Sequence, residues 1–257
     1  MQIMGQRPAT LAWVLAAAAL LGAGSASAQL PDKYKNLQVL PKDISKADLV
    51  ESMKQLTNAL GVRCTYCHVG EEKAGVPPFQ DFKFDSDDKA PKVTARAMMK
   101  MTADINSKYL AEIKTGRDRK LQVSCMTCHH AVAIPQTIGE ILMDVVADKG
   151  GAAAEQKYRE LRKQYEGRAA YDFGEFVLHD VIRTLANKGR VDDALVLEKM
   201  NVEFHPDSSR AFFTLGELYA GKDDKAAAAD AYRKAIAISP DNEQAKKRLA
   251  EVTKAGS

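Results

Sequence analysis

Two short motifs use every cysteine of this 257-residue chain, and they constrain its fold more than any other feature. Each is a C-x-x-C pair followed at once by histidine, one at residues 64–68 and the other at 125–129. This pattern predicts covalent attachment of haem c, with two thioether bonds to the porphyrin and the histidine as an iron ligand. The sequence therefore predicts two covalently bound haem c groups, attached through Cys64, Cys67, Cys125 and Cys128 and ligated by His68 and His129.

Three other uses of paired cysteines are weaker. Structural disulfides suit an exported protein, and four cysteines can hold zinc, but neither explains a histidine after each pair. A thioredoxin-like redox pair belongs in a βαβ context, and no strand pattern flanks either motif. Haem attachment accounts for all six residues.

The segment before each motif has the pattern of an amphipathic helix. The first begins at Ser45 with Asp48 as a capping-box partner and ends at Gly61; the second begins near Pro91 and ends at or before Gly116. The two helices align without gaps from Met53 and from Met98. The unit of helix, turn and haem motif is thus used twice, with 11 residues from methionine to first cysteine in one copy and 27 in the other.

The repeated methionine indicates the second axial ligands. A thioether is a soft ligand that suits haem iron and raises its potential when paired with histidine. We therefore expect Met53 and Met98 to complete the coordination of the two irons, with Met101, one turn further along the second helix, as the rival of Met98. The alternative is that methionines on an apolar helical face are ordinary packing residues.

These units resemble the haem units of the cytochrome subunit of photosynthetic reaction centres. The stretch 94–106, Thr-Ala-Arg-Ala-Met-Met-Lys-Met-Thr-Ala-Asp-Ile-Asn, is similar to the second haem helix of that family, where the first methionine of the pattern binds iron. The resemblance covers about residues 32–138 and supports Met98 over Met101. It differs in two respects, because the photosynthetic members carry four haems and many have a lipid-bearing N-terminal cysteine. The resemblance implies a short dihaem relative.

The C-terminal part matches the tetratricopeptide pattern. Residues 209–242 place Phe212, Gly216, Tyr219 and Tyr232 at the spacing of the 34-residue consensus, and a degenerate copy precedes them at 175–208. Small residues such as Gly216 let paired helices approach closely. Residues 243–252 are expected to form a capping helix. Such repeats usually present a concave surface to a protein partner, although they can also be structural bracing.

The N-terminus has the features of a cleavable signal peptide. Arg7 precedes an apolar run at 11–21, and Ala26-Ser27-Ala28 offers small residues for cleavage. We expect residues 1–28 to be removed, the protein to be periplasmic, and no transmembrane helix to remain. The formal net charge of +3 comes from scattered basic residues and excludes a nucleic-acid partner. An acidic cluster, Asp85, Asp87 and Asp88, is interpreted as solvated surface beside the first haem.

The expected fold is mainly α-helical: a dihaem cytochrome c domain at 29–140, connecting helices at 141–174, and a tetratricopeptide-like module at 175–257. The expected function is one-electron transfer between redox partner proteins, with the repeats docking a partner and no enzymatic activity. Two alternatives stay open. One is a dihaem peroxidase or ligand-sensing protein with one open iron, and the other is an assembly or scaffold protein whose haems are ancillary.

Overall fold

The computed structural model describes residues 33–71, 74, 79–114, 116 and 120–254. The expected signal peptide at 1–28 lies outside this part of the chain. The prediction of a mainly helical fold is confirmed, since the described residues form helices and no strand, apart from one isolated bridge between Val69 and Lys83. None of the helices in the described ranges has the length and apolarity needed to cross a membrane.

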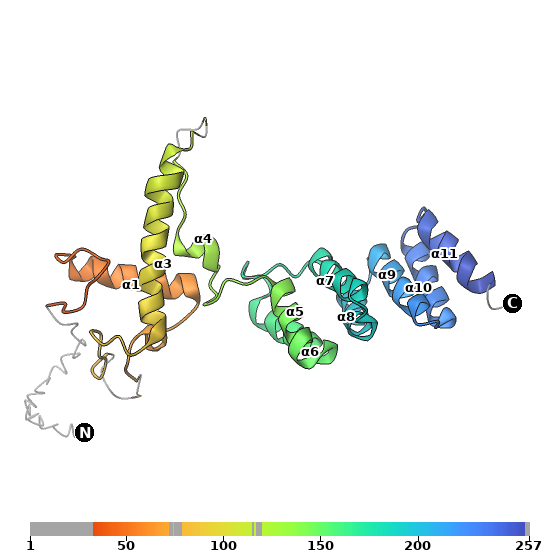
Figure 1. Cartoon of the computed structure of the whole chain (residues 1–257), viewed down its shortest axis with the longest axis horizontal. Helices are drawn as coiled ribbons and strands as arrows, with labels where there is room; N and C mark the ends of the chain where they lie inside the picture. Colours follow the sequence, from red (N-terminus) through yellow and green to blue (C-terminus); the bar gives the residue numbers. More distant parts are fainter. Residues whose placement is uncertain (1–32, 72–73, 75–78, 115, 117–119, 255–257) are drawn as a thin grey trace, which may run out of the picture.

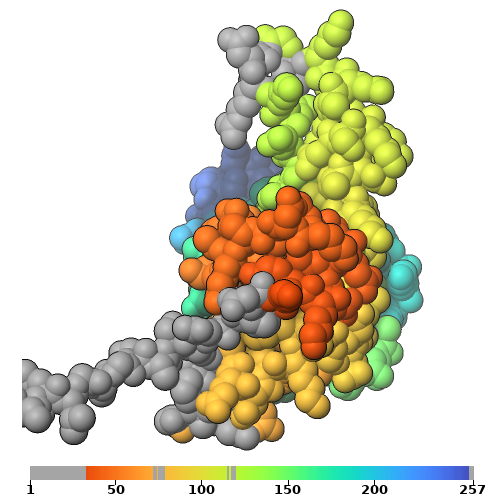
Figure 2. Space-filling view, turned by 90° about the vertical axis from the view of Figure 1, so that its left-hand side faces the viewer, coloured from red at the N-terminus to blue at the C-terminus, as the bar shows by residue number. Residues whose placement is uncertain are grey.

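The N-terminal part contains two long helices and two helices of one turn. In chain order these are α1 (Lys46–Leu60), α2 (Cys64–Cys67), α3 (Ala90–Asp104) and α4 (Cys125–His129). A π-helix, η1 (Ile105–Tyr109), and a 3₁₀ helix, η2 (Leu110–Glu112), continue directly from α3. In Figure 1 α3 crosses α1, and its far end projects away from the rest of the protein. Figure 2 shows α1 and the lower part of α3 together on one face of this part.

α1 begins and ends where the sequence predicts, but the Asp48 carboxylate accepts from the Ser45 hydroxyl and not from the Ser45 N–H, so the expected capping box is not formed. The hydroxyl of Ser45 accepts a hydrogen bond from the backbone N–H of Asp48 at 3.1 Å, which satisfies one of the free donors of the first turn. Gly61 follows the last turn in the left-handed conformation, with φ of 64°. That conformation suits glycine, which ends the helix and turns the chain toward Cys64.

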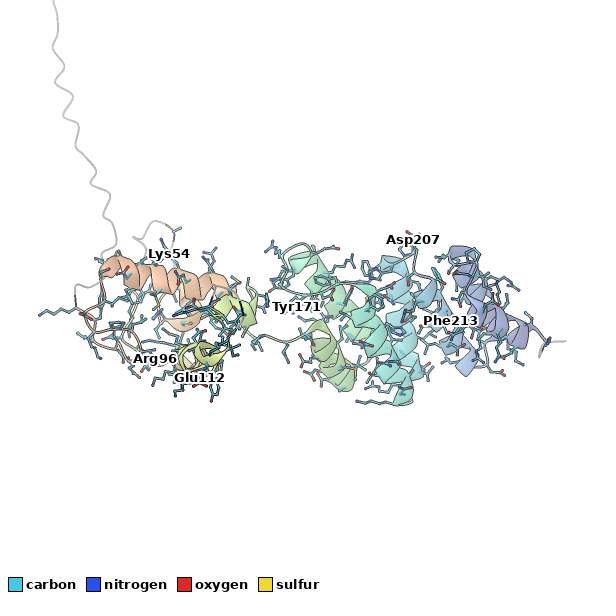
Figure 3. All side chains as sticks on the ribbon, turned by 90° about the horizontal axis from the view of Figure 1, so that it is seen from above. Lys54, Arg96, Glu112, Tyr171, Asp207 and Phe213 are labelled. Atoms are coloured by element: carbon cyan, nitrogen blue, oxygen red, sulfur yellow. The ribbon has the colours of Figure 1, made fainter. Side chains whose placement is uncertain are left out.

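The C-terminal part is a stack of paired antiparallel helices. They are α5 (Ile138–Lys149), α6 (Gly151–Tyr165), α7 (Glu175–Asn187), α8 (Val191–Phe204), α9 (Ser209–Gly221), α10 (Lys225–Ile238) and α11 (Glu243–Lys254). The starts of α7, α9 and α11 are 34 residues apart, and so are those of α8 and α10. Figure 3, seen from above, shows the stack extending away from the N-terminal part.

Two clusters of buried side chains hold this stack together. The larger joins α5, α6, α7 and α8 with Leu218 of α9 and includes the fully buried Leu142, Tyr158 and Leu178. The smaller joins α9, α10 and α11 around Phe212 and Ala235. The helices α5 and α6 therefore share a core with α7 and α8.

Candidate functional site: two cysteine-histidine motifs

The first C-x-x-C pair lies on a single turn of helix. Cys64 and Cys67 are the two ends of α2, and they do not form a disulfide with each other. Burial raises the pKa of the Cys67 thiol, and the nearby Cys64 raises it further, while Lys89 opposes the shift. The thiol is therefore protonated at neutral pH. A thioredoxin-like pair instead lowers the pKa of its reactive thiol, so this environment is unlike that of a redox-active pair.

His68, which follows this pair, is half-buried. The Nδ1 atom of His68 is buried and has no hydrogen-bond partner among the described residues. The ring of Phe84 lies edge-on to the imidazole, with 5.0 Å between the ring centroids. Burial lowers the pKa of His68 to about 4, and the positive charges of Lys92, Arg96 and Lys89 act in the same direction. The imidazole is thus neutral at pH 7, and the neutral form is the one that binds metal ions.

The second motif also forms a short helix with an ordered start. A capping box between Ser124 and Thr127 begins α4, which runs from Cys125 to His129. The Nδ1 atom of His129 lies 3.0 Å from the carbonyl oxygen of Val132. In the neutral imidazole, a bond from Nδ1–H to that carbonyl selects the tautomer whose lone pair is on Nε2. A histidine held in this way can offer Nε2 to a metal ion.

The two units interlock. The helix α1 packs against α4, and α2 packs against α3, so each cysteine helix lies beside the long helix of the other unit. At the junction the N–H of Ala131 donates to the carbonyl of Ala59 at 2.9 Å. A Cβ atom on Gly61 would collide with the carbonyl of Ala131. Gly61 is therefore needed twice, for its left-handed conformation and for this close approach.

The candidate methionine ligands lie on the two long helices that precede the motifs. Met53 is half-buried on α1. On α3, Met98 and Met101 are both solvent-exposed, at 38% and 47%. They are spaced three residues apart and so share one face of the helix, which means that the exposure of these side chains does not by itself favour one over the other.

A network of charged side chains lies beside the first motif, and the sequence analysis did not predict it. The carboxylate of Asp87 pairs with Arg96 at 2.8 Å and with Lys92 at 3.0 Å, and Asn36 donates to it at 2.9 Å. These hydrogen bonds, led by that from Arg96, hold the pKa of Asp87 well below its usual range. Lys92 also donates to the carbonyl of Phe84 at 2.7 Å. Asp87 thus ties α3 to the loop that carries Phe84.

The part of the chain that carries the two motifs exposes many apolar side chains. Among the described residues, ten of the twelve large hydrophobic side chains that are exposed belong to residues 66–134. Among the described residues of 33–137 there are two buried hydrophobic side chains, Ala59 and Val132, whereas 23 lie beyond residue 137. An apolar porphyrin beside each motif would cover such side chains and supply the missing core. The residues present therefore fit covalently bound haem.

Comparison with known proteins agrees with this fit. The profile of the photosynthetic reaction centre cytochrome C subunit family matches residues 12–197. Cytochrome c-554 of Chloroflexus aurantiacus is 31% identical over 109 residues, which are 42% of this chain and 23% of that protein. The Hsp70-Hsp90 organizing protein of Triticum aestivum is 41% identical over 71 residues, 28% of this chain and 12% of that protein.

These matched segments span less than a quarter of the length of either curated relative. The family profile, in contrast, covers well over half of the present chain and includes both cysteine-histidine motifs. The cysteines of the two motifs form no disulfide, and the part of the chain around them in sequence has exposed apolar side chains and little core of its own. Covalent haem accounts for these features, and the family match implies the same group. The chain belongs to the photosynthetic reaction centre cytochrome C subunit family and is a c-type cytochrome.

Proposed function

We propose that this protein is an exported dihaem cytochrome that carries single electrons between redox partners. The observation that carries the proposal is the unequal core of the two parts. The described residues of 33–137, which include both C-x-x-C-H motifs, bury almost no hydrophobic side chains of their own and expose ten large ones. Two porphyrins, one at each motif, would complete this part of the protein.

Each residue of the two motifs has a defined role in this proposal. Cys64 and Cys67 attach the first haem and Cys125 and Cys128 the second, while His68 and His129 are the proximal ligands. The neutral imidazole of His68 and the fixed tautomer of His129 support these roles. Haem iron supplies one-electron chemistry by changing oxidation state.

Methionine occupies the sixth position of each iron in our proposal. Met53 pairs with His68 and Met98 pairs with His129, because the two methionines hold the same position in the repeated unit. An iron with both axial positions filled by the protein has no site for a substrate. The protein then acts as an electron carrier and not as a peroxidase.

The C-terminal helices form a docking module. Their 34-residue period, with starts at 175, 209 and 243, is the period of tetratricopeptide repeats. Stacks of this kind present extended surfaces to protein partners. We assign the cytochrome domain to 29–140, connecting helices to 141–174 and the repeats to 175–257, and we place a redox partner on the repeats.

The apolar run and the small residues before position 29 support export to the periplasm. Removal of residues 1–28 would leave the helices described above intact, since the first of them begins at Lys46.

An absorbance spectrum of the purified holoprotein, oxidised and reduced, with and without carbon monoxide, tests the proposal. We expect two haems per chain, a weak far-red band from methionine ligation and no response to carbon monoxide. A shift in one haem on adding carbon monoxide would overturn the carrier assignment and favour a peroxidase or a ligand sensor.

The scaffold alternative needs a separate test. Capture of a partner that requires residues 175–257 but is unchanged when all four cysteines are replaced would favour an assembly factor with ancillary haems. An electron carrier requires instead that the captured partner exchange electrons with the haems at a rate that the repeats increase.

A further inference from the structure

The two haem units reach their motifs by different routes. In the first, α1 ends at Gly61, and the N–H of Val62 donates to the carbonyl of Thr57 at 3.0 Å. Cys64 follows two residues after Val62. In the second, the chain leaves α3 through η1 and η2 and returns only at Val123, two residues before Cys125. A long excursion of this kind needs a contact that brings the returning chain back to the helix.

Asn106 supplies that contact. Its Nδ2 atom donates to the carbonyl of Val123 at 2.8 Å, and its Oδ1 atom accepts from the N–H of Val123 at 2.8 Å. Both polar ends of the carboxamide and both backbone groups of Val123 are therefore paired. The two residues are 17 positions apart in sequence, so these bonds close the whole excursion.

The position of Asn106 in the repeat is significant. When Met53 is aligned with Met98, Asn106 falls on Gly61, and Val123 corresponds to Val62 as the residue two before the first cysteine. In the first unit a left-handed glycine turns the chain directly toward its motif. In the second unit a side chain reaches across a gap to the equivalent point of the returning chain. The residue two before the first cysteine is thus held at the end of the long helix in both units, by a glycine turn in the first and by the Asn106 side chain in the second.

The local backbone prepares Asn106 for this role. It lies in the π-helix η1, at the point where α3 ends. A π-turn inserts one residue into a helix and is frequently found at functional sites. From Val123 the chain passes directly to Ser124, whose capping box with Thr127 begins α4. Asn106 therefore holds the residue immediately before the cap of the second motif.

We propose that Asn106 is a positioning residue of the second haem. Its carboxamide holds Val123 against the end of α3 and so fixes the cysteine-histidine helix relative to the helix that carries Met98. Only a carboxamide offers a neutral donor and acceptor side by side, as both backbone groups of Val123 require. This inference rests on the proposed function, because it concerns the iron that His129 and Met98 are proposed to ligate.

The test compares Asn106→Leu with Ser107→Ala in the full-length holoprotein. The leucine variant removes both bonds to Val123 at similar volume. The control removes a local bond from the next residue, whose hydroxyl donates to the carbonyl of Ala103 at 2.8 Å. Two readouts are taken: amide hydrogen exchange at Val123, and the carbon monoxide response of the reduced protein.

In Asn106→Leu we expect the exchange protection at Val123 to fall about tenfold. We also expect one of its two haems to bind carbon monoxide. Both haems stay attached, because no cysteine is changed, and Ser107→Ala behaves as wild type. If Asn106→Leu does not accumulate, Asn106→Asp is measured in the same way. It keeps the acceptor for the Val123 N–H but places a second carboxylate oxygen against the Val123 carbonyl in place of the donor, and we expect a change in the same direction.

Wild-type protection at Val123 and a closed second haem in these variants would overturn the inference alone. A wild-type protein that binds carbon monoxide or carries a single haem contradicts the proposed function instead, and it does so whatever the variants show. The two failures are therefore distinguishable in one set of measurements.

Discussion

Gly216 on α9 faces the ring of Tyr232 on α10 with no room for a side chain between them. A Cβ atom on Gly216 would overlap the ring carbons of Tyr232, which is fully buried. We expect Gly216→Ala to destabilise the C-terminal stack by about 1–3 kcal/mol, the usual cost of overpacking a well-packed interior. Chemical denaturation followed by helical circular dichroism measures the change.

Gly221, at the end of the same helix, is the matched control. No heavy atom lies within 4 Å of the position its Cβ would take. Gly221→Ala should therefore be neutral or stabilising by up to about 1 kcal/mol, because alanine reduces the entropy of the unfolded chain. Equal effects of the two substitutions would show that the contact with Tyr232 does not limit the approach of α9 and α10.

Removal of the haems should unfold the N-terminal part of the protein and leave the C-terminal stack folded. We expect a variant with all four cysteines changed to alanine to lose protected structure in residues 33–137, because Ala59 and Val132 are the only buried hydrophobic residues among those that the structure describes there. The stack from α5 to α11 keeps its own core and should remain helical. Limited proteolysis with mass spectrometry of the full-length variant checks this.

The holoprotein is the control for that experiment, and it should resist the protease in both parts. A protease-resistant fragment from residues 33–137 of the cysteine-free variant would mean that this part folds without its cofactor. The observation that carries the proposed function would then have a different explanation.

Replacement of the axial methionines should change one haem at a time. We expect Met53→Ala and Met98→Ala each to open one iron to carbon monoxide and to lower its potential by on the order of 100 mV, since axial ligands tune haem potentials over about 0.8 V. Loss of the far-red band and a redox titration report the two effects. Met101→Ala, on the same face of α3, is the control and should leave both haems closed.

The outcome at Met101 decides between the two candidates on α3. If Met101→Ala opens the second haem and Met98→Ala does not, the axial ligand of that iron is Met101. If neither substitution alters the spectrum, neither Met98 nor Met101 is an axial ligand of the second iron.

Features that depend on neighbouring residues could be predicted from the sequence. The caps of α1 are an example, because Ser45 and Gly61 act through hydrogen bonds within a few residues of themselves. The helical period of the C-terminal part is another, because each repeat has the same local pattern. The close fit of Gly216 was also predictable, since the consensus places a small residue where two helices meet.

Contacts between distant segments could not be predicted in the same way. Asn106 is an ordinary polar residue in sequence, and its importance lies in a bond to a residue 17 positions away. Asp87 belongs to an acidic cluster that we interpreted as solvated, but the fold brings Arg96 and Lys92 to its carboxylate. The junction of Ala59 with Ala131 likewise joins segments that no local pattern relates.

A buried acid in the C-terminal stack makes the stability of this part depend on pH. Glu198 on α8 is completely buried, and its Oε2 atom has no hydrogen-bond partner among the described residues. Its one bond is from Asn201, at 3.3 Å to Oε1. Burial raises the pKa of Glu198 to about 8 from an ordinary value of 4.5, and the negative charge of Glu175 adds to the shift.

The folded state therefore binds the proton of Glu198 more tightly than the unfolded state does. Below pH 4.5 Glu198 is protonated in both states, and the stack is then at its most stable with respect to this group. Between pH 4.5 and about 8 the unfolded state ionises first, so the free energy of unfolding falls as the pH rises, by an amount on the order of a few kcal/mol. Glu198→Gln keeps the acceptor for Asn201 without the charge and should remove this fall in the free energy of unfolding.

Denaturation midpoints at pH 5, 7 and 9 measure the fall in the wild type and in the variant. Glu203→Gln, on the exposed side of the same helix, should retain the wild-type slope over this range, and a slope that persists in Glu198→Gln would assign the effect to another group.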